Sequence, residues 1–304
     1  LDDDYTLGTF LKDNKYNEWF KNNFILPMGA AIWSTPVEKM LDFPIKNFLL
    51  FFKNHDLLNG LSPSKRWKTV DGGSKIYVEK IIKKIGNRVK SGCKVVNVKR
   101  TKNKVRLRFK DGSSEEFDHV IFSTKANEIL KILDDPKEEE KEILSHFEVS
   151  RNRAVLHSDN TLMPKLKNVW SSWNFISDES KNILDRPSSV TYWMNRLQSI
   201  EKKFPLFVSL NPINDPKDNC IFDEFIYYHP MFKSQTFSYQ KKLDLIQGRG
   251  GIWYSGAWLG YGFHEDGLVS GLRILKTFGY EKEWMTNITS FKNKFIHDGH
   301  FHGT

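Results

Sequence analysis

The residues best suited to chemistry lie in one segment, Gly-Ile-Trp-Tyr-Ser-Gly-Ala-Trp-Leu-Gly-Tyr-Gly-Phe-His-Glu-Asp-Gly-Leu-Val-Ser-Gly-Leu-Arg-Ile-Leu at 251–275. The pattern predicts a strand over 251–257, a glycine-rich loop and a helix over 268–278. Glycines let a backbone approach a ligand closely, and a helix N-terminus offers N–H groups and partial positive charge to electron-rich oxygens. The segment is therefore a candidate cofactor site, and a purely structural strand–turn–helix is the alternative.

His264 is the residue of this segment that could act as an acid or base near neutral pH. The alternative is that His264 is an ordinary loop residue that contacts the ligand only through its backbone atoms. The His-rich tail at 297–302 has metal-ligand residue types but lacks the regular helical spacing of a zinc motif, so no metal site is predicted.

The rest of the chain predicts both helices and strands. Residues 7–60 favour helices, and 75–89 favour a helix whose apolar stripe packs on the core, formed by Val78, Ile81, Ile82, Ile85 and Val89. Strands are predicted over 93–99, 104–110 and 117–124, with a hairpin turn at Asp111-Gly112. Further strands are predicted at 154–158, 169–174, 189–194, 206–210 and 221–228, and further helices at 126–133, within 134–148 and at 235–247.

Composition narrows the class of protein. A chain of 304 residues with 39% hydrophobic and 27% charged residues is long enough for two domains and is neither disordered nor fibrous. Only Cys93 and Cys220 occur, which excludes a disulfide scaffold and makes a reducing, cytoplasmic compartment the default. No apolar run is long enough to span a bilayer.

Basic residues concentrate between Lys75 and Lys110, where 14 Lys and Arg face one acid, Glu79. Lys104, Arg106, Arg108 and Lys110 alternate with apolar residues along one predicted strand and so share one face. This basic ribbon could meet an anionic membrane surface, and a solvated outer face is the alternative.

The segment at 251–275 resembles the C-terminal flavin-binding motif of the flavin-containing amine oxidase superfamily, which includes phytoene-desaturase-like and protoporphyrinogen-oxidase-like proteins. Asp71-Gly72-Gly73-Ser74, the strand at 94–98 and the stretch 117–126 resemble further elements of that superfamily. The stretches 26–36, 190–198 and 260–267 look like a bacterial branch labelled NAD/FAD-binding protein. Genes of that branch often lie beside cyclopropane-fatty-acid-synthase-like methyltransferase genes.

The resemblance implies FAD as the cofactor and assigns residues to it. Those assigned to the flavin or nucleotide are Gly72, Gly73, Val96, Gly256, Ala257, Phe263, His264, Glu265 and Gly267. Apart from the resemblance, the predicted strands of the second domain carry aromatic residues that could line an apolar substrate channel, for which ordinary sheet packing is the alternative: Trp170, Trp173, Tyr192 and Trp193. Tyr261 in the glycine-rich loop is a further candidate for the channel. His264 is the candidate catalytic residue.

The sequence departs from the family pattern in two respects. The glycine-rich G-x-G-x-x-G motif, which holds the FAD pyrophosphate, does not occur, so the sequence resembles the C-terminal part of a family member whose N-terminal nucleotide-binding part is missing. Ala257 follows Gly256 where many relatives have an acid, so no acid is assigned there.

The fold expected is α/β (α+β) and amine-oxidase-like, without the N-terminal βαβ unit. The expected domains are an interrupted FAD-binding domain at 68–127 and 249–285, a substrate domain with helices at 1–67 and a mixed sheet at 128–248, and a tail at 286–304. The expected function is FAD-dependent oxidation or double-bond isomerisation of an unsaturated or methyl-branched acyl chain. Amine oxidation and a non-enzymatic module that binds anionic membranes are the alternatives, and no nucleic-acid partner is expected.

Overall fold

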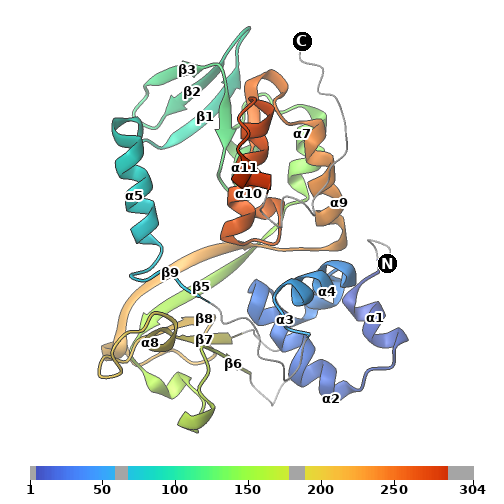
Figure 1. Cartoon of the computed structure of the whole chain (residues 1–304), viewed down its shortest axis with the longest axis vertical. Coiled ribbons are helices and arrows are strands. Elements are labelled where there is room, and N and C mark those ends of the chain that lie inside the picture. The colour runs from blue at the N-terminus through green and yellow to red at the C-terminus, as the bar shows by residue number, and fades with distance from the viewer. Residues whose placement is uncertain (1–4, 59–67, 178–188, 287–304) are drawn as a thin grey trace. The chain divides into compact units, whose positions relative to one another are not determined.

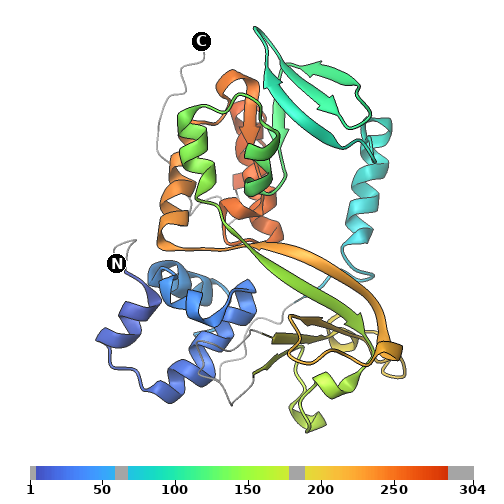
Figure 2. The same ribbon diagram turned by 180° about the vertical axis from the view of Figure 1, so that it is seen from behind.

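A computed structural model describes residues 5–58, 68–177 and 189–286. It divides the chain into two compact units, each made of two separate stretches of sequence (Figures 1 and 2). Unit 1 contains residues 1–92 and 149–234, and unit 2 contains residues 93–148 and 235–304. The tail beyond residue 286 lies outside the described residues.

The N-terminal part of unit 1 is helical, as the sequence predicts. Its helices are α1 (Leu7–Asp13), α2 (Glu18–Phe20), α3 (Leu26–Trp33) and α4 (Ile45–Asn54), with a π-helical turn at Lys21–Ile25 and a 3₁₀ helix at Val37–Asp42. Side chains cap the first two helices, because the Thr6 hydroxyl and the Asn17 amide oxygen accept N–H groups that lack helical partners. Trp33, Phe43 and Phe48 pack as a buried aromatic group beneath them.

The sheet of unit 1 has five strands in the order β6-β7-β8-β5-β9. The strands are β5 (Val149–His157), β6 (Trp173–Ile176), β7 (Ser189–Trp193), β8 (Phe207–Leu210) and β9 (Ile221–Pro230). Every neighbouring pair is antiparallel, whereas the sequence predicted a mixed sheet. Parallel neighbours need a long crossover, and within the described residues the connections between these strands carry only short helical turns such as α8 (Met194–Leu197).

Unit 2 contains a β-meander and a short parallel pair. The meander is β1 (Val95–Arg100), β2 (Val105–Phe109) and β3 (Ser114–Phe117), and β4 (Val120–Phe122) pairs in parallel with β10 (Ile252–Tyr254). Its helices are α6 (Ala126–Ile132), α7 (Glu138–Ser145), α9 (Ser234–Lys242), α10 (His264–Thr277) and α11 (Glu283–Thr286). One buried core joins the meander, the parallel pair and α6, α7 and η10 (Ala257–Leu259), and includes Val98, Val105, Ile129, Ile252 and Trp258.

The observed division differs from the predicted boundaries. Residues 128–148 belong to unit 2 because Ile143, Leu144 and Phe147 pack into the core that contains Val98 and Val105. Residues 68–92 are grouped with unit 1.

Helix α5 (Lys75–Ile85) forms where the sequence predicts a helix, but its apolar stripe is not buried. Val78, Ile81, Ile82 and Ile85 are all exposed, as is Val89 beyond the end of the helix. The expectation that this stripe packs on the core is therefore wrong for the described structure, in which no residue of α5 is buried.

Candidate functional site

The site begins where the two parallel strands of unit 2 end. Beyond β4 and β10 lie Ser123 and Ser255, whose hydroxyl oxygens are 2.8 Å apart. The Ser255 N–H donates to the Phe122 carbonyl at 2.8 Å, which continues the pairing to this point. Ligands of α/β proteins bind outside the carboxyl ends of parallel strands, so this edge is the natural position for a site. The sequence analysis missed both serines, although each directly follows a short apolar strand.

Gly256 turns the chain from β10 into the loop. Its φ is +150°, and a Cβ on it would lie 2.5 Å from Nε1 of Trp258. That indole N–H donates to the Thr124 carbonyl at 3.1 Å, and the Gly256 N–H donates to the Ser270 hydroxyl at 2.9 Å. A side chain at position 256 would displace Trp258, so the glycine is required for this turn.

Asp266 fixes the rest of the loop. Its Oδ2 accepts the N–H groups of Tyr261 at 2.9 Å and Phe263 at 3.0 Å, and the residue is 8% exposed. A Cβ on Gly260 would lie 2.0 Å from Asp266 Oδ1, so the loop closes on the carboxylate only because residue 260 has no side chain. The sequence analysis named the neighbouring Glu265, which is exposed, and missed Asp266.

One face of α10 is open next to this loop. A Cβ on Gly267 would meet only the Ala257 nitrogen, at 3.7 Å, and a Cβ on Gly271 would meet nothing within 4 Å. Gly267 lies in the first turn of a 14-residue helix, where the helix dipole favours electron-rich oxygens. A flat or extended ligand could therefore lie along the backbone of the strand end and the first turn of the helix.

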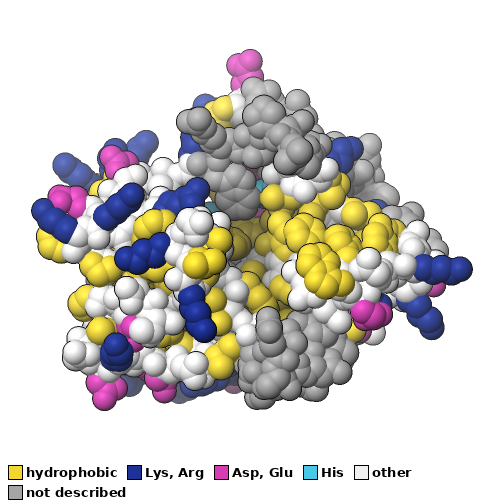
Figure 3. All heavy atoms as spheres, turned by 90° about the horizontal axis from the view of Figure 1, so that it is seen from below, with side chains coloured by type: hydrophobic (Ala, Val, Ile, Leu, Met, Phe, Trp, Pro, Cys, Tyr) yellow, Lys and Arg dark blue, Asp and Glu magenta, His cyan; other side chains and the backbone are white. Residues whose placement is uncertain are grey.

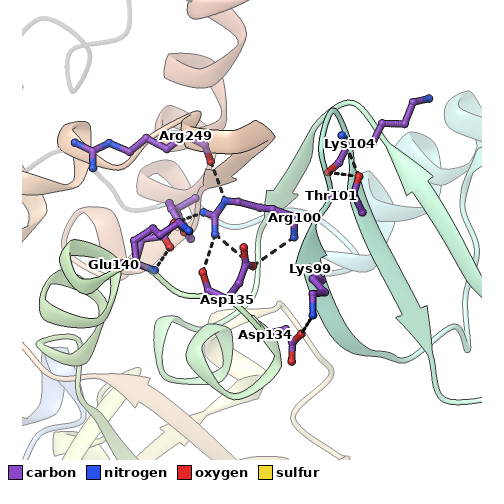
Figure 4. Close-up of polar contacts among 10 residues, drawn as sticks. Lys99, Arg100, Thr101, Lys104, Asp134, Asp135, Glu140 and Arg249 are labelled. Carbon is purple, nitrogen blue, oxygen red and sulfur yellow. Dashed lines mark hydrogen bonds and ion pairs between the residues drawn. The ribbon is translucent and has the colours of Figure 1, made fainter.

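A largely buried ion-pair network around Arg100 (Figure 4) is linked to β10 through Tyr254. Arg100 contacts Asp135, Glu140 and the carbonyl oxygen of Arg249, and the Tyr254 hydroxyl donates to Glu140 Oε1 at 2.6 Å. Burial first, and then the Glu140 carboxylate, raise the pKa of Tyr254 above its usual value. Tyr254 immediately precedes Ser255, so the network fixes the strand end from which the loop starts.

Comparison with known proteins identifies the family. A sequence profile described as "Flavin containing amine oxidoreductase" matches residues 9–196, more than half of the chain. The chain belongs to the flavin-containing amine oxidoreductases. A search of curated proteins found no match.

Solved structures share the fold of this flavin-containing amine oxidoreductase. A CLA-producing fatty acid isomerase from P. acnes is 13% identical with a TM-score of 0.58, over 91% of this chain and 74% of that chain. A reduced UDP-galactopyranose mutase is 11% identical with a TM-score of 0.57, over 93% and 70%. A putrescine oxidase bound to putrescine is 12% identical with a TM-score of 0.60, over 91% and 68%. These structural similarities show the amine-oxidase-like fold that the sequence predicted, and family membership supports FAD as the cofactor.

The residues of unit 2 fit a flavin cofactor. Gly267 and Gly271 leave open the face of α10 that a bound group needs, and Ala257 borders it without a side chain large enough to fill it. Of the assigned residues, Gly256, Ala257, Phe263, His264, Glu265 and Gly267 come together here with Tyr261. Val96 belongs to the same unit, at a β-bulge where β1 shifts its register against β2.

The remaining assigned residues lie in unit 1. Gly72 and Gly73 form a turn before α5 with φ of +79° and +82°, and the Gly73 N–H donates to the Val70 carbonyl at 2.9 Å. Tyr192 and Trp193 end β7, where Tyr192 contacts Trp173 edge-on at 5.4 Å and Trp193 contacts Trp170 in the same way at 5.4 Å. Trp170 lies outside the strand that was predicted to include it, after a 3₁₀ turn at Lys167–Val169.

Burial disfavours ionisation of the Tyr192 hydroxyl. Desolvation raises the pKa of Tyr192 to about 12, against the opposing effect of a hydrogen bond with Ser34. This end of β7 is thus an apolar aromatic group with one neutral hydroxyl.

Proposed function

We propose that this protein is a FAD-dependent oxidoreductase that acts on an apolar, unsaturated or methyl-branched fatty-acyl chain. The observation that supports the flavin part is the open face of α10 at Gly267, next to a loop that Asp266 holds in place. The acyl part is supported by the aromatic group at the end of β7, where Tyr192 contacts Trp173 and Trp193 contacts Trp170. An acyl chain gains from burial against such side chains and needs few polar partners.

The chemistry divides between cofactor and protein. A bound flavin supplies a two-electron acceptor that can take and return a hydride, so isomerisation needs no net oxidant and desaturation needs a further electron acceptor. The protein's own task is to orient the chain and to exclude water, for which aromatic side chains such as Trp193 are suited. His264, exposed at the start of α10, is proposed to hold or release a proton.

Anaerobic mixing tests this proposal. The protein, supplied with saturating FAD, is mixed with an unsaturated fatty acid, and the flavin spectrum and the double-bond positions of the recovered lipid are followed. We expect a shifted or additional double bond in the lipid. Unchanged lipid together with an unchanged flavin spectrum would contradict the proposal.

Amine oxidation is the second candidate. It is supported by the family and by the aromatic pair of Tyr261 and Phe237, whose ring centroids are 5.7 Å apart beside the loop. Amine oxidation needs aromatic rings around the substrate amine, and Phe263 follows in the same loop. Flavin bleaching by putrescine, but not by fatty acids, in the same anaerobic experiment would favour this candidate.

We also propose that the protein is cytoplasmic and that the basic ribbon contacts anionic membranes peripherally. No helix in the described part of the chain is long and apolar enough to cross a bilayer. In the structure Arg106 pairs with Glu116 at 2.8 Å and Lys104 with Asp118 at 3.7 Å, which reduces the charge of the ribbon. A colourless protein that binds phosphate groups tightly and releases them in salt would instead favour a non-enzymatic membrane-binding module.

A further inference from the structure

The helical part of unit 1 carries an unbroken line of aromatic rings. Tyr5, Phe10, Tyr16, Phe20 and Phe24 follow one another with ring centroids 6.3, 5.7, 5.3 and 5.4 Å apart. We call these five residues, together with Trp19, the aromatic ladder. It extends from Tyr5, two residues before α1, through α2, to the π-helical turn at Lys21–Ile25.

Much of the ladder faces solvent. Trp19 is 72% exposed, Phe24 47% and Tyr16 40%. Figure 3 shows hydrophobic side chains gathered over this helical part of the molecule. Single exposed apolar residues are ordinary on protein surfaces, but a contiguous apolar group marks an interaction site.

The scaffold beneath the ladder is well supported. Leu7, Leu11 and Ile25 of the same helical segments are buried, and the Asn17 side chain caps α2 by accepting the Phe20 N–H at 2.8 Å. The π-helical turn under Phe24 leads directly into the buried helix α3, and such turns are frequent at functional sites. The ladder is therefore held in place by the core of unit 1.

Basic and acidic residues alternate along the ladder. Lys12, Lys15 and Lys21 lie between its rings in the sequence, but so do Asp13 and Glu18, and Asp2, Asp3 and Asp4 precede Tyr5, so the segment has no net positive charge. Asp13 accepts the Tyr5 hydroxyl at 2.8 Å, and Glu18 pairs with Lys21. Trp and Tyr rings combined with Lys side chains, whose stems lie along apolar surface, are typical of the boundary between lipid headgroups and acyl chains.

The exposed area favours a bilayer over a second copy of the chain. A large aromatic side chain has about 150–250 Å² of surface that can be buried, so the exposed parts of Trp19, Phe24 and Tyr16 together present roughly 300–400 Å² of accessible surface. A stable protein interface needs about 800 Å² on each partner. A bilayer needs no such minimum, because each inserted side chain adds to the affinity.

We propose that the aromatic ladder docks on the headgroup–acyl boundary of a lipid bilayer. The inference deepens the proposed function, since acyl chains are found in bilayers, but docking requires neither flavin nor turnover. Its failure is therefore distinguishable from failure of the proposed reaction.

Vesicle co-sedimentation tests the proposal with the whole chain. Vesicles of phosphatidylcholine, with and without phosphatidylglycerol, are mixed with the wild type, with Trp19→Ser and with the double variant Trp19→Ser and Phe24→Ser. The matched control is Leu166→Ser with Phe204→Ser, because these side chains are 66% and 60% exposed elsewhere in unit 1. Circular dichroism verifies that each variant is folded.

We expect the double variant to lose at least about tenfold in partition onto the mixed vesicles, the scale of removing two buried apolar side chains, with a smaller loss for Trp19→Ser and none for the control. Wild-type protein that does not sediment with vesicles would overturn the proposal. So would equal binding by the wild type and the double variant. Self-association that the double variant abolishes, without any vesicle binding, would assign the ladder to a second copy instead.

Discussion

Gly267 is the residue at which ligand binding can be separated from folding. Because a Cβ there meets only the Ala257 nitrogen at 3.7 Å, a side chain is compatible with the fold but occupies the space assigned to the flavin. We expect Gly267→Val to weaken binding of added FAD at least about tenfold, because the valine side chain would prevent close approach of the ligand to the helix backbone. FAD titration followed by flavin fluorescence measures the effect. Leu268→Val, on the exposed face of the same helix, is the control for a β-branched residue and should bind as the wild type does.

Asp266 acts on the same site through the loop. Removing its carboxylate leaves the N–H groups of Tyr261 and Phe263 without their acceptor, which costs about 1–3 kcal/mol for each group that stays buried. We expect Asp266→Ala to lower the melting temperature and weaken FAD binding, and Asp266→Asn to recover part of both because its amide oxygen still accepts hydrogen bonds. Thermal unfolding and FAD titration provide the two readouts. Equal loss in both variants would show that the acceptor is not what positions the loop.

The strands of unit 1 contain a buried titratable element. His157 on β5 is fully buried, and its Nε2 lies 2.8 Å from the Ser209 hydroxyl on β8, which in turn lies 2.8 Å from the Thr191 hydroxyl on β7. Burial lowers the pKa of His157 below 6.5, although the nearby Asp159 opposes this effect. His157 therefore binds a proton more readily in the unfolded chain than in the folded sheet. Its contribution to the free energy of unfolding is fully present above pH 6.5 and is lost as the pH decreases through the folded-state pKa.

We therefore expect the free energy of unfolding to fall more steeply between pH 7 and pH 5 in the wild type than in His157→Asn, which cannot take up that proton. Urea denaturation at a series of pH values measures both slopes. Parallel slopes in the two proteins would remove His157 as the cause.

The basic ribbon is an element whose charges can be tested together. Each basic residue near an anionic leaflet contributes about 1 kcal/mol, and exposed charges are screened over about 8 Å at physiological ionic strength. We expect the variant with all four residues changed to Gln to bind anionic vesicles less than the wild type at low salt, and the difference to vanish at high salt. Equal binding to neutral and anionic vesicles, or equal binding by the wild type and the variant, would show that the ribbon is only a solvated face.

Local pattern was enough to predict most elements. Strict alternation located β2, and the apolar periodicity located α5. The strand predicted at 117–124 corresponds to β4 (Val120–Phe122), whereas β3 (Ser114–Phe117), which pairs with β2 after the Asp111-Gly112 turn, was not predicted. The start of α10 was predicted four residues late, at 268, because the helix begins at His264 on a turn closed by Asp266. That contact depends on the loop folding back on itself, and no local spacing encodes it. The stripe of α5 shows a related limit, because periodicity reveals an apolar face but not what covers it.

At the scale of the whole molecule, the 304 residues contain only some of the elements that hold FAD. The flavin-site residues of unit 2 supply a strand end, a loop and a helix terminus, but the G-x-G-x-x-G motif that holds a pyrophosphate does not occur in these 304 residues. We expect the 304 residues, expressed alone, to be purified with less than one FAD per chain. Absorbance of the purified protein measures this, and a full equivalent of tightly held FAD would contradict it.

Hydrogen exchange tests the flavin site most directly, because it reports on the backbone that is assigned to the cofactor. The 304-residue chain is exchanged with and without saturating FAD, and peptides covering each unit are compared. We predict that FAD slows exchange in the segment from Gly256 to Gly267, which forms the strand end, the loop and the first turn of α10. Protection confined to other segments, or no protection at saturating FAD, would contradict the assignment of this loop and helix to the flavin.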